Sequence, residues 1–253
     1  MIRIGVFGAG GRMGATVCGA VAGDPALELV AGIDPNHAGE SVEGVTIVAQ
    51  PSDVTVEVDV VIDFTVVDAA RANVLWAAEH GVHAVVGTTG FTAEDHAAFA
   101  AAFTRSNCVI APNFAIGAVM MIAFAERAAP FFETAEIIEL HHDAKIDAPS
   151  GTAMHTAERM AAASSEWAPD PTEKVIVPGA RGSAGPGGIR IHAVRMRGMV
   201  ASQEVILGTT GQSLTIRHDT YDRSSFMPGV LLAAKAISER PGLTVGLDKL
   251  LEL

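Results

Sequence analysis

The sequence predicts an α/β protein, in which a Rossmann-like doubly wound parallel sheet is joined to a smaller α+β domain with an open mixed sheet. Over about the first 115 residues, short apolar runs alternate with runs of helical periodicity, the order that βαβ units produce. A glycine-rich turn, VFGAGGRMG, follows the first apolar run. Later in the chain, polar and apolar residues alternate, which is typical of strands with one solvated face.

In the first half, short runs rich in β-branched residues predict buried parallel strands, and apolar residues at helical spacing predict helices. The expected strands are 2–8, 27–34, 46–49, 58–65, 83–90 and 108–114. The expected helices are 11–23, 67–81 and 92–106. Thr92 is a good N-cap because Asp95 stands at the third helical position, which allows a capping box.

The second half has a different pattern. Helices are expected over 115–132, from Ser150 into the 160s, and over 225–240; strands are expected at 135–142, 189–196, 202–208 and 213–219. The segment 166–189 is rich in Pro, Gly and Ser and predicts a flexible loop. GTTGQ, at 208–212, predicts a hairpin turn, so the sheet here is mixed or antiparallel.

Composition excludes several classes of partner. The net charge of −12 disfavours nucleic acid and anionic membrane surfaces. Cys18 and Cys108 lie in no zinc-binding spacing, so we expect two buried thiols in a reducing compartment. The glycine-broken N-terminus does not resemble a signal peptide, and no apolar run is long enough to span a membrane. We therefore expect a soluble, cytoplasmic protein.

The glycine-rich turn predicts a dinucleotide site. Its glycines fit the strict G-x-G-x-x-G poorly, whereas Gly8, Gly11 and Gly14 fit a G-x-x-G-x-x-G spacing. Such a loop brings backbone N–H groups and a helix N-terminus to a pyrophosphate. Asp34 ends the second strand, twenty residues past Gly14, where a carboxylate should accept the ribose hydroxyls. A turn that holds no ligand is the alternative.

Two further strand ends, GTTGF at 87–91 and APNFA at 111–115, should line the same crevice. Their small residues let a nicotinamide ring approach the backbone. Pro35-Asn36 follows Asp34 where NADP enzymes often carry a basic residue, while Arg12 offers a place for a 2′-phosphate. We expect NADH to be used, with NADPH as a second cofactor.

The segment ELHHDAKIDAPSGTA, residues 139–153, gathers proton-active and anion-binding groups. His141 and His142 end a strand and point to opposite sides, with Lys145 shortly after them. Ser150 is expected to cap a helix whose first free N–H groups, with the lysine, form a carboxylate site. Histidine titrates near neutrality and can carry a proton to a reacting atom.

Two other chemistries fit this segment less well. The two histidines resemble half of a metal site, but no third ligand stands at a useful spacing and Asp143 and Asp147 are the only local acids. Ser150 as a nucleophile would need a G-x-S-x-G elbow, which is absent. We therefore predict no metal.

The motifs GAGGRMG, VVIDFT, VVGTTGF, APNFAIG, ELHHDAKIDAPSGTA and RHD…DRSSFMPGV occur in this order along the whole chain. In them the sequence resembles the 4-hydroxy-tetrahydrodipicolinate reductase (dihydrodipicolinate reductase) family, which acts in the diaminopimelate route to lysine. The H-H-x-x-K-x-D-A-P-S-G-T block is highly specific to that family.

The resemblance implies an NAD(P)H-dependent oxidoreductase that reduces a cyclic imine dicarboxylate and forms a homotetramer. It implies a dinucleotide-binding domain of residues 1–113 and 221–253, and a substrate-binding and oligomerisation domain of residues 114–220. His141 matches the catalytic acid/base and Lys145 the proton donor. The substrate-binding matches are His142, Gly151 and Thr152, with Ser150 and Thr89 close by. The cofactor-binding matches are Gly8, Ala9, Gly10, Gly11, Arg12, Met13, Asp34, Gly87, Thr88, Thr89, Ala111, Pro112, Asn113 and Phe114.

Three rival functions share some of these features. An aspartate- or homoserine-type dehydrogenase would have the nucleotide loop but lack the histidine–lysine block. A regulator that senses NAD(H) would have no use for proton donors beside a helix cap. An assembly scaffold would account only for the strands in the middle of the chain.

Overall fold

The structure is a computed structural model that describes all residues from Met1 to Leu253. The chain divides into two compact units: unit 1 comprises Met1–Ile116 and Arg223–Leu253, and unit 2 comprises Gly117–Asp222. The sequence placed these limits at 113 and 221, a few residues earlier. No helix is both long enough and apolar enough to cross a membrane.

Unit 1 is built on an eight-stranded sheet in the order β13-β7-β6-β5-β1-β2-β4-β3. Every pair is parallel except β3 with β4, so the predicted doubly wound sheet is confirmed. The strands are β1 (Ile2–Phe7), β2 (Leu27–Ile33), β3 (Ser41–Val42), β4 (Val45–Val48), β5 (Val60–Asp63), β6 (His83–Val86), β7 (Cys108–Ile110) and β13 (Leu243–Val245). The strand order changes direction at β1, and sheets of this class bind ligands at the carboxyl ends beside such a point.

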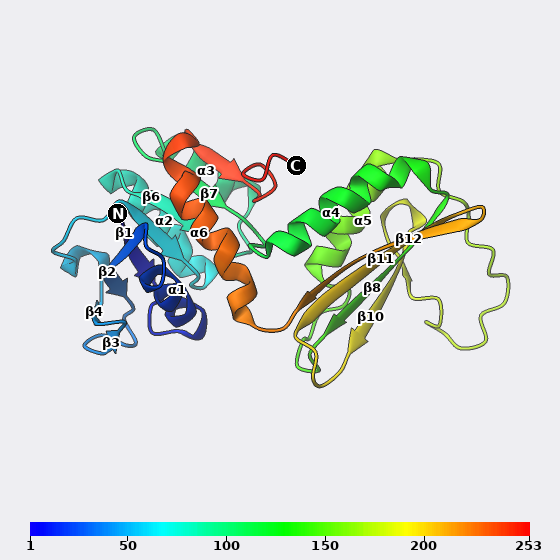
Figure 1. Cartoon of the computed structure of the whole chain (residues 1–253), viewed down its shortest axis with the longest axis horizontal. Helices are drawn as coiled ribbons and strands as arrows, with labels where there is room; N and C mark the ends of the chain where they lie inside the picture. The colour runs from blue at the N-terminus through cyan, green and yellow to red at the C-terminus, as the bar shows by residue number, and fades with distance from the viewer. The chain divides into compact units, whose positions relative to one another are not determined.

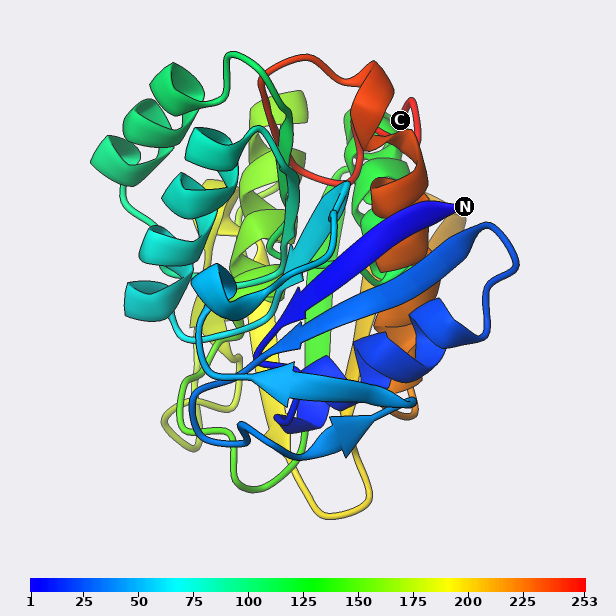
Figure 2. The ribbon, with the colours of Figure 1, turned by 90° about the vertical axis from the view of Figure 1, so that its left-hand side faces the viewer.

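Helices cover both faces of this sheet. Figure 2 shows α1 (Arg12–Ala22) and α6 (Met227–Ala236) on one face, and α2 (Val67–His80) and α3 (Ala93–Ala102) on the other. The expected capping box is present, since Thr92 Oγ1 accepts from the Asp95 N–H at 3.2 Å and the Asp95 carboxylate accepts from the Thr92 N–H at 2.8 Å. The predicted helix end, residue 106, was wrong by four residues, since α3 ends at Ala102. The segment after the alanine-rich run contains no glycine or proline that would mark the end of the helix.

Unit 2 contains a five-stranded sheet in the order β12-β11-β8-β10-β9. Its central strand, β8 (Thr134–His141), pairs in parallel with β10 (Arg190–Arg195) and antiparallel with β11 (Ala201–Thr209). The mixed sheet is therefore confirmed. The other strands are β9 (Ser183–Ala184) and β12 (Gln212–Thr220). The predicted hairpin turn is present as Thr210–Gly211 between β11 and β12.

One face of this sheet is covered by α4 (Ile116–Ala128) and α5 (Gly151–Ala163), which lie side by side (Figure 1). Residues on alternate positions of β8 share this face because strand side chains alternate. Ile137 packs here against Met121 of α4 and Met160 of α5. Glu139 and His141 follow Ile137 at the same parity, so the helix-covered face carries a buried carboxylate and then an imidazole.

His83, at the start of β6, gives unit 1 a pH-dependent contact. Its Nδ1 accepts the Asn107 N–H at 2.9 Å, and burial lowers the pKa of its imidazole despite the opposing charge of Asp59. The unfolded chain therefore binds more protons than the folded chain just below pH 6.5, so this contribution to the free energy of unfolding is lost as pH falls.

We expect His83→Gln to weaken this dependence, because the amide oxygen can still accept the Asn107 N–H but does not titrate. Between about pH 7.5 and about pH 5.5, the variant should lose less free energy of unfolding than the wild type. Urea denaturation at both pH values measures the difference. Equal losses in the two proteins would show that His83 does not titrate in this way.

Candidate active site

The loop between β1 and α1 leaves backbone groups open for an anion. Gly8 has a φ of +72°, the left-handed region that glycine tolerates. Gly11 is the N-cap of α1, and no side chain accepts a hydrogen bond from the first N–H groups of this helix. A Cβ on Gly14 would lie 1.9 Å from the Gly8 oxygen, so helix and loop touch directly. These features fit the pyrophosphate of a dinucleotide.

Asp34 lies at the end of β2, buried and fixed beside this loop. Its carboxylate accepts the Gly10 N–H at 3.2 Å and the Asn36 N–H at 2.9 Å. It also contacts Nδ1 of His37 at 3.0 Å, and a Cβ on Gly10 would lie 2.2 Å from the His37 ring. The carboxylate therefore stands where ribose hydroxyls are bound in this class of site. The contact of His37 with Asp34 was not predicted, because it depends on how the His37 ring packs against Gly10.

The other predicted cofactor segments follow neighbouring strands, β6 and β7. A Cβ on Gly87 would lie 2.0 Å from the Phe64 ring, and this ring lies 5.8 Å from that of Phe114 between centroids. Asn113 Oδ1 accepts the Ala115 N–H at 2.9 Å. Both turns thus lie at the carboxyl edge of the sheet, next to β5. All predicted cofactor positions belong to unit 1: Gly8, Ala9, Gly10, Gly11, Arg12, Met13, Asp34, Gly87, Thr88, Thr89, Ala111, Pro112, Asn113 and Phe114.

Asp63, the last residue of β5, was not singled out in the sequence, yet it holds the turn after β5 and the turn at 87–89. The buried carboxylate accepts the Thr65 N–H at 2.9 Å and its hydroxyl at 2.8 Å. It also accepts the Asn73 amide at 2.7 Å and the Thr88 hydroxyl at 3.0 Å. The only signal in the sequence is a charged residue at the end of the apolar run VVID.

We expect Asp63→Ala to lower the free energy of unfolding by about 1–3 kcal/mol, because the buried Thr88 hydroxyl and several partly buried donors lose their acceptor. NADH affinity should also fall, since Thr88 is no longer fixed. Asn73→Ala, which removes one of these hydrogen bonds, should have a smaller effect on both. Urea denaturation and titration of NADH fluorescence measure the two quantities. An unchanged NADH affinity in Asp63→Ala would remove Asp63 from the cofactor site.

In unit 2, the catalytic candidate His141 is the last residue of β8. Its Nδ1 lies 2.5 Å from the Glu139 carboxylate, which is completely buried. Burial lowers the pKa of His141; Glu139 opposes this shift, and the charges of Lys145 and Arg195 add to it. The imidazole is therefore largely neutral at pH 7, with its second nitrogen left to exchange protons.

The segment 142–149 carries the second candidate, Lys145. Its ammonium contacts both carboxylate oxygens of Asp147, at 2.7 and 2.8 Å, and holds the pKa of that carboxyl below its usual range. His142 is exposed. Asp143, one of the two local acids in this segment, pairs with Arg197 at 2.9 Å.

The N-terminus of α5 completes this group. Ser150 is the N-cap, as predicted, and its Oγ accepts the Ala153 N–H at 3.2 Å. The Ser150 N–H donates in turn to Glu139 at 3.2 Å. Gly151 and Thr152 are the first helical residues, whose N–H groups have no acceptor within a helix. The predicted substrate residues His142, Ser150, Gly151 and Thr152 thus share unit 2 with His141 and Lys145, whereas Thr89 belongs to unit 1.

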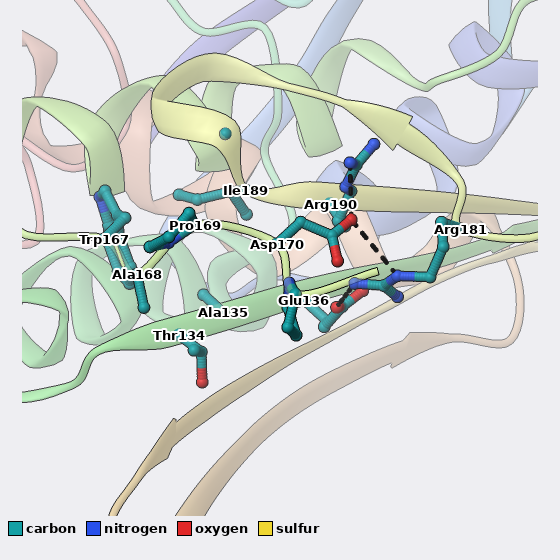
Figure 3. A pocket seen from close by; sticks show the side chains of 12 residues that line it. Thr134, Ala135, Glu136, Trp167, Ala168, Pro169, Asp170, Arg181, Ile189 and Arg190 are labelled. Carbon is teal, nitrogen blue, oxygen red and sulfur yellow. Dashed lines mark hydrogen bonds and ion pairs between the residues drawn. The ribbon is translucent and has the colours of Figure 1, made fainter. Parts of the chain in front are cut away.

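A pocket of about 80 Å³ in the same unit lies at the opposite end of β8, where the strand begins at Thr134 (Figure 3). Its charged groups neutralise one another: Arg181 contacts Glu136 at 2.6 Å, and Arg190 contacts Asp170 at 2.6 Å. It therefore offers a dicarboxylate no spare positive charge. The anion site predicted from the sequence lies at the His141 end of the strand.

Comparison with known proteins gives a consistent result. Two family models match the chain: dihydrodipicolinate reductase, N-terminus, over residues 2–114, and dihydrodipicolinate reductase, C-terminus, over residues 117–251. A 4-hydroxy-tetrahydrodipicolinate reductase of Corynebacterium urealyticum is 49% identical over 260 residues, covering 100% of both chains. One of Nocardia farcinica is 49% identical over 259 residues, covering 100% of this chain and 99% of the relative.

A solved structure is also similar. Dipicolinate-bound dihydrodipicolinate reductase from Paenisporosarcina sp. TG-14 matches with a TM-score of 0.89 and 37% sequence identity. The match covers 98% of this chain and 99% of that one. Both sheets described above are therefore shared with it.

Proposed function

Because the chain belongs to the dihydrodipicolinate reductase family, we propose that His141 and Lys145 transfer the protons in its reaction. The chain is an oxidoreductase that reduces 4-hydroxy-tetrahydrodipicolinate in lysine biosynthesis. The rival functions, a dehydrogenase of the aspartate or homoserine type, an NAD(H) sensor and a scaffold, are set aside. The single observation that supports the proton-transfer assignment is one hydrogen-bonded cluster. His141 and the α5 N-terminus both contact Glu139, and Arg195, which also binds Glu139, holds the backbone of the Lys145 segment.

The family implies the use of NAD(P)H, which supplies a hydride when bound. The residues of this chain that would hold it are the 8–13 loop, Asp34 and the turns at 87–89 and 111–114. We propose that NADH is used, with NADPH as a second cofactor. Asp34 favours free ribose hydroxyls, whereas the exposed Arg12 offers a 2′-phosphate one positive charge.

The substrate is a six-membered cyclic imine with two carboxylates. We place one carboxylate at the N–H groups of Gly151 and Thr152 and the Thr152 hydroxyl, where the helix dipole favours an anion. The Lys145 ammonium supplies a charged donor. His141 accepts a proton at Nε2 and returns it from there, because Glu139 holds the Nδ1–H.

We also propose a homotetramer, assembled through the face of the five-stranded sheet that α4 and α5 do not cover. Strand alternation puts Ile138 and Leu140 of β8 and Ile206 of β11 on this face, so it carries apolar side chains that no helix of the chain packs upon. Apolar sheet faces of this kind are buried between copies in symmetric oligomers. Native mass spectrometry would give four copies; a monomer at micromolar concentration would contradict the proposal.

The activity is tested by following NADH oxidation at 340 nm with the imine, generated in place by the synthase that precedes this step. Oxidation should require the imine. It should not occur when the synthase is left out and aspartate semialdehyde is the only substrate, as it would in a dehydrogenase of the homoserine type. Parallel assays with NADPH give the preference between the two cofactors. Oxidation at equal rates without imine would contradict the assignment.

A further inference from the structure

Three elements of unit 2 meet at a single buried carboxylate, that of Glu139. It accepts from His141 Nδ1 at the end of β8, from the Ser150 N–H at the start of α5, and from Arg195 at the end of β10. The guanidinium binds both carboxylate oxygens, at 2.8 and 2.9 Å. The side chain of Glu139 is completely inaccessible to solvent, and a buried carboxylate is tolerated only when it is paired and hydrogen-bonded in this way.

Arg195 has a second contact that reaches the Lys145 segment. Its Nη2 donates to the backbone oxygen of Asp147 at 2.6 Å, and Asp147 is the residue whose carboxylate holds the Lys145 ammonium. Arg195 lies directly beside His141 in the parallel register of β10 and β8. One guanidinium therefore connects the buried carboxylate with the segment that carries the lysine.

We propose that Glu139 and Arg195 are positioning residues for the reaction: Glu139 fixes the ring and tautomer of His141, and Arg195 fixes the 142–149 segment and with it Lys145. This inference rests on the proposed roles of His141 and Lys145. It assigns a function to Glu139, which begins the 139–153 segment, and to Arg195, which lies 56 positions further along the chain.

The tautomer follows from the chemistry of the carboxylate. An ionised carboxylate can only accept, so it requires a proton on Nδ1 and leaves Nε2 free to exchange one with the substrate. A carboxylate holds the catalytic histidine of hydrolase triads in the same way, and its loss permits the wrong tautomer. Burial of Glu139 would raise its pKa, but the hydrogen bonds from Arg195 and His141 outweigh this and keep the carboxyl ionised.

The decisive variant is Glu139→Gln in the full-length chain, because its amide can donate to Nδ1 and so permits the other tautomer. We expect kcat to fall by up to about 10⁴-fold, the loss caused by the same carboxylate-to-amide change in a hydrolase triad. The NADH dissociation constant should stay within about twofold of wild type. The charged groups around His141 are Glu139, Lys145 and Arg195; removal of the only negative one should move the titration of His141 to lower pH. ¹⁵N NMR of the ring reads tautomer and titration directly.

The NMR and kinetic readouts separate two kinds of failure. An altered ring tautomer or titration with unchanged kcat would support the positioning by Glu139 but contradict the catalytic role of His141. An unchanged tautomer and titration would overturn the positioning itself, whatever happens to kcat. Where Glu139→Gln does not fold, Glu139→Asp decides by the same readouts, since it keeps the charge beside Arg195 but withdraws the carboxylate from the ring.

Glu126→Gln is the matched control. Glu126 of α4 pairs with Arg159 of α5, so this variant also takes a carboxylate from an arginine in unit 2, but away from His141. It should leave kcat and the His141 signals at wild-type values. Equal changes in both variants would reduce the role of Glu139 to general stabilisation of the unit and overturn the proposal.

Arg195→Lys tests the other half of the inference. The lysine keeps the positive charge near His141 but cannot bind Glu139 with two parallel hydrogen bonds and reach Asp147 as well. We expect KM for the imine to rise about threefold to tenfold, the effect of losing one or two hydrogen bonds. The pH at which His141 titrates should stay the same as in the wild type. An unchanged KM would overturn the role of Arg195 in holding the segment.

Discussion

His141→Gln should lower kcat by about 10²–10⁴-fold, the usual contribution of a positioned proton donor or acceptor. Glutamine fills a similar volume and can still hydrogen-bond Glu139, so the fold should be retained. It has no group that titrates near neutrality and cannot deliver a proton to the substrate. The affinity for NADH should change little, because the residues that we assign to the cofactor belong to unit 1.

Lys145→Ala should lower kcat over the same range of about 10²–10⁴-fold, and should also raise KM, since the ammonium is one of the donors that we assign to a substrate carboxylate. Steady-state kinetics with the cyclic imine give both constants, and NADH fluorescence gives the cofactor dissociation constant. His155→Gln is the matched control for the histidine: His155 is exposed on α5 and contacts Glu158 only at 3.8 Å. Turnover at the wild-type level in both His141→Gln and Lys145→Ala would refute the assignment.

Gly14→Ala should have the largest effect in unit 1. The added methyl carbon would lie 1.9 Å from the Gly8 oxygen and 2.6 Å from its carbonyl carbon, and both are backbone atoms that no side-chain rotation can move. Helix α1 must therefore shift away from the loop that we assign to the pyrophosphate. We expect NADH affinity to fall at least tenfold, and the free energy of unfolding to fall by about 1–3 kcal/mol, the usual cost of overpacking.

Gly19→Ala in the same helix is the matched control for this prediction. Its nearest neighbour would be Glu43 Oε1 at 3.6 Å, an ordinary contact. Because alanine favours a helix over glycine by about 1 kcal/mol, this variant should be at least as stable as the wild type and bind NADH normally. Similar NADH affinities for Gly14→Ala and Gly19→Ala would disprove the importance of the close approach.

Most strands and helices could be predicted because their signals are local. Buried parallel strands such as β1 and β5 are short apolar runs, and the capping box at Thr92 is a four-residue pattern. β3, β9 and β13 were missed because two or three residues carry no measurable period. β9 lies inside the segment 166–189, which was predicted to be a loop throughout. The helix ends were less accurate than the helices themselves, as at α3, since fraying depends on packing.

In the candidate site, too, residues with a local signal could be predicted and residues placed by the fold could not. His141, Lys145 and Ser150 lie within ten residues, so the sequence displays them together. Glu139 belongs to the same segment, and its position two residues before His141 predicts that both side chains lie on one face of the strand. Arg195 could not have been found from spacing alone, because only the parallel register of β10 with β8 brings it beside His141.

The contact between Lys145 and Asp147 affects how the substrate is held. The ammonium has a carboxylate partner within its own segment, at 2.7 Å, so a substrate carboxylate would replace one anion by another. The gain in binding free energy is then the difference between two similar ion pairs, and is modest. Asp147 would recapture the ammonium when the reduced ring leaves, which favours rapid product release over tight retention.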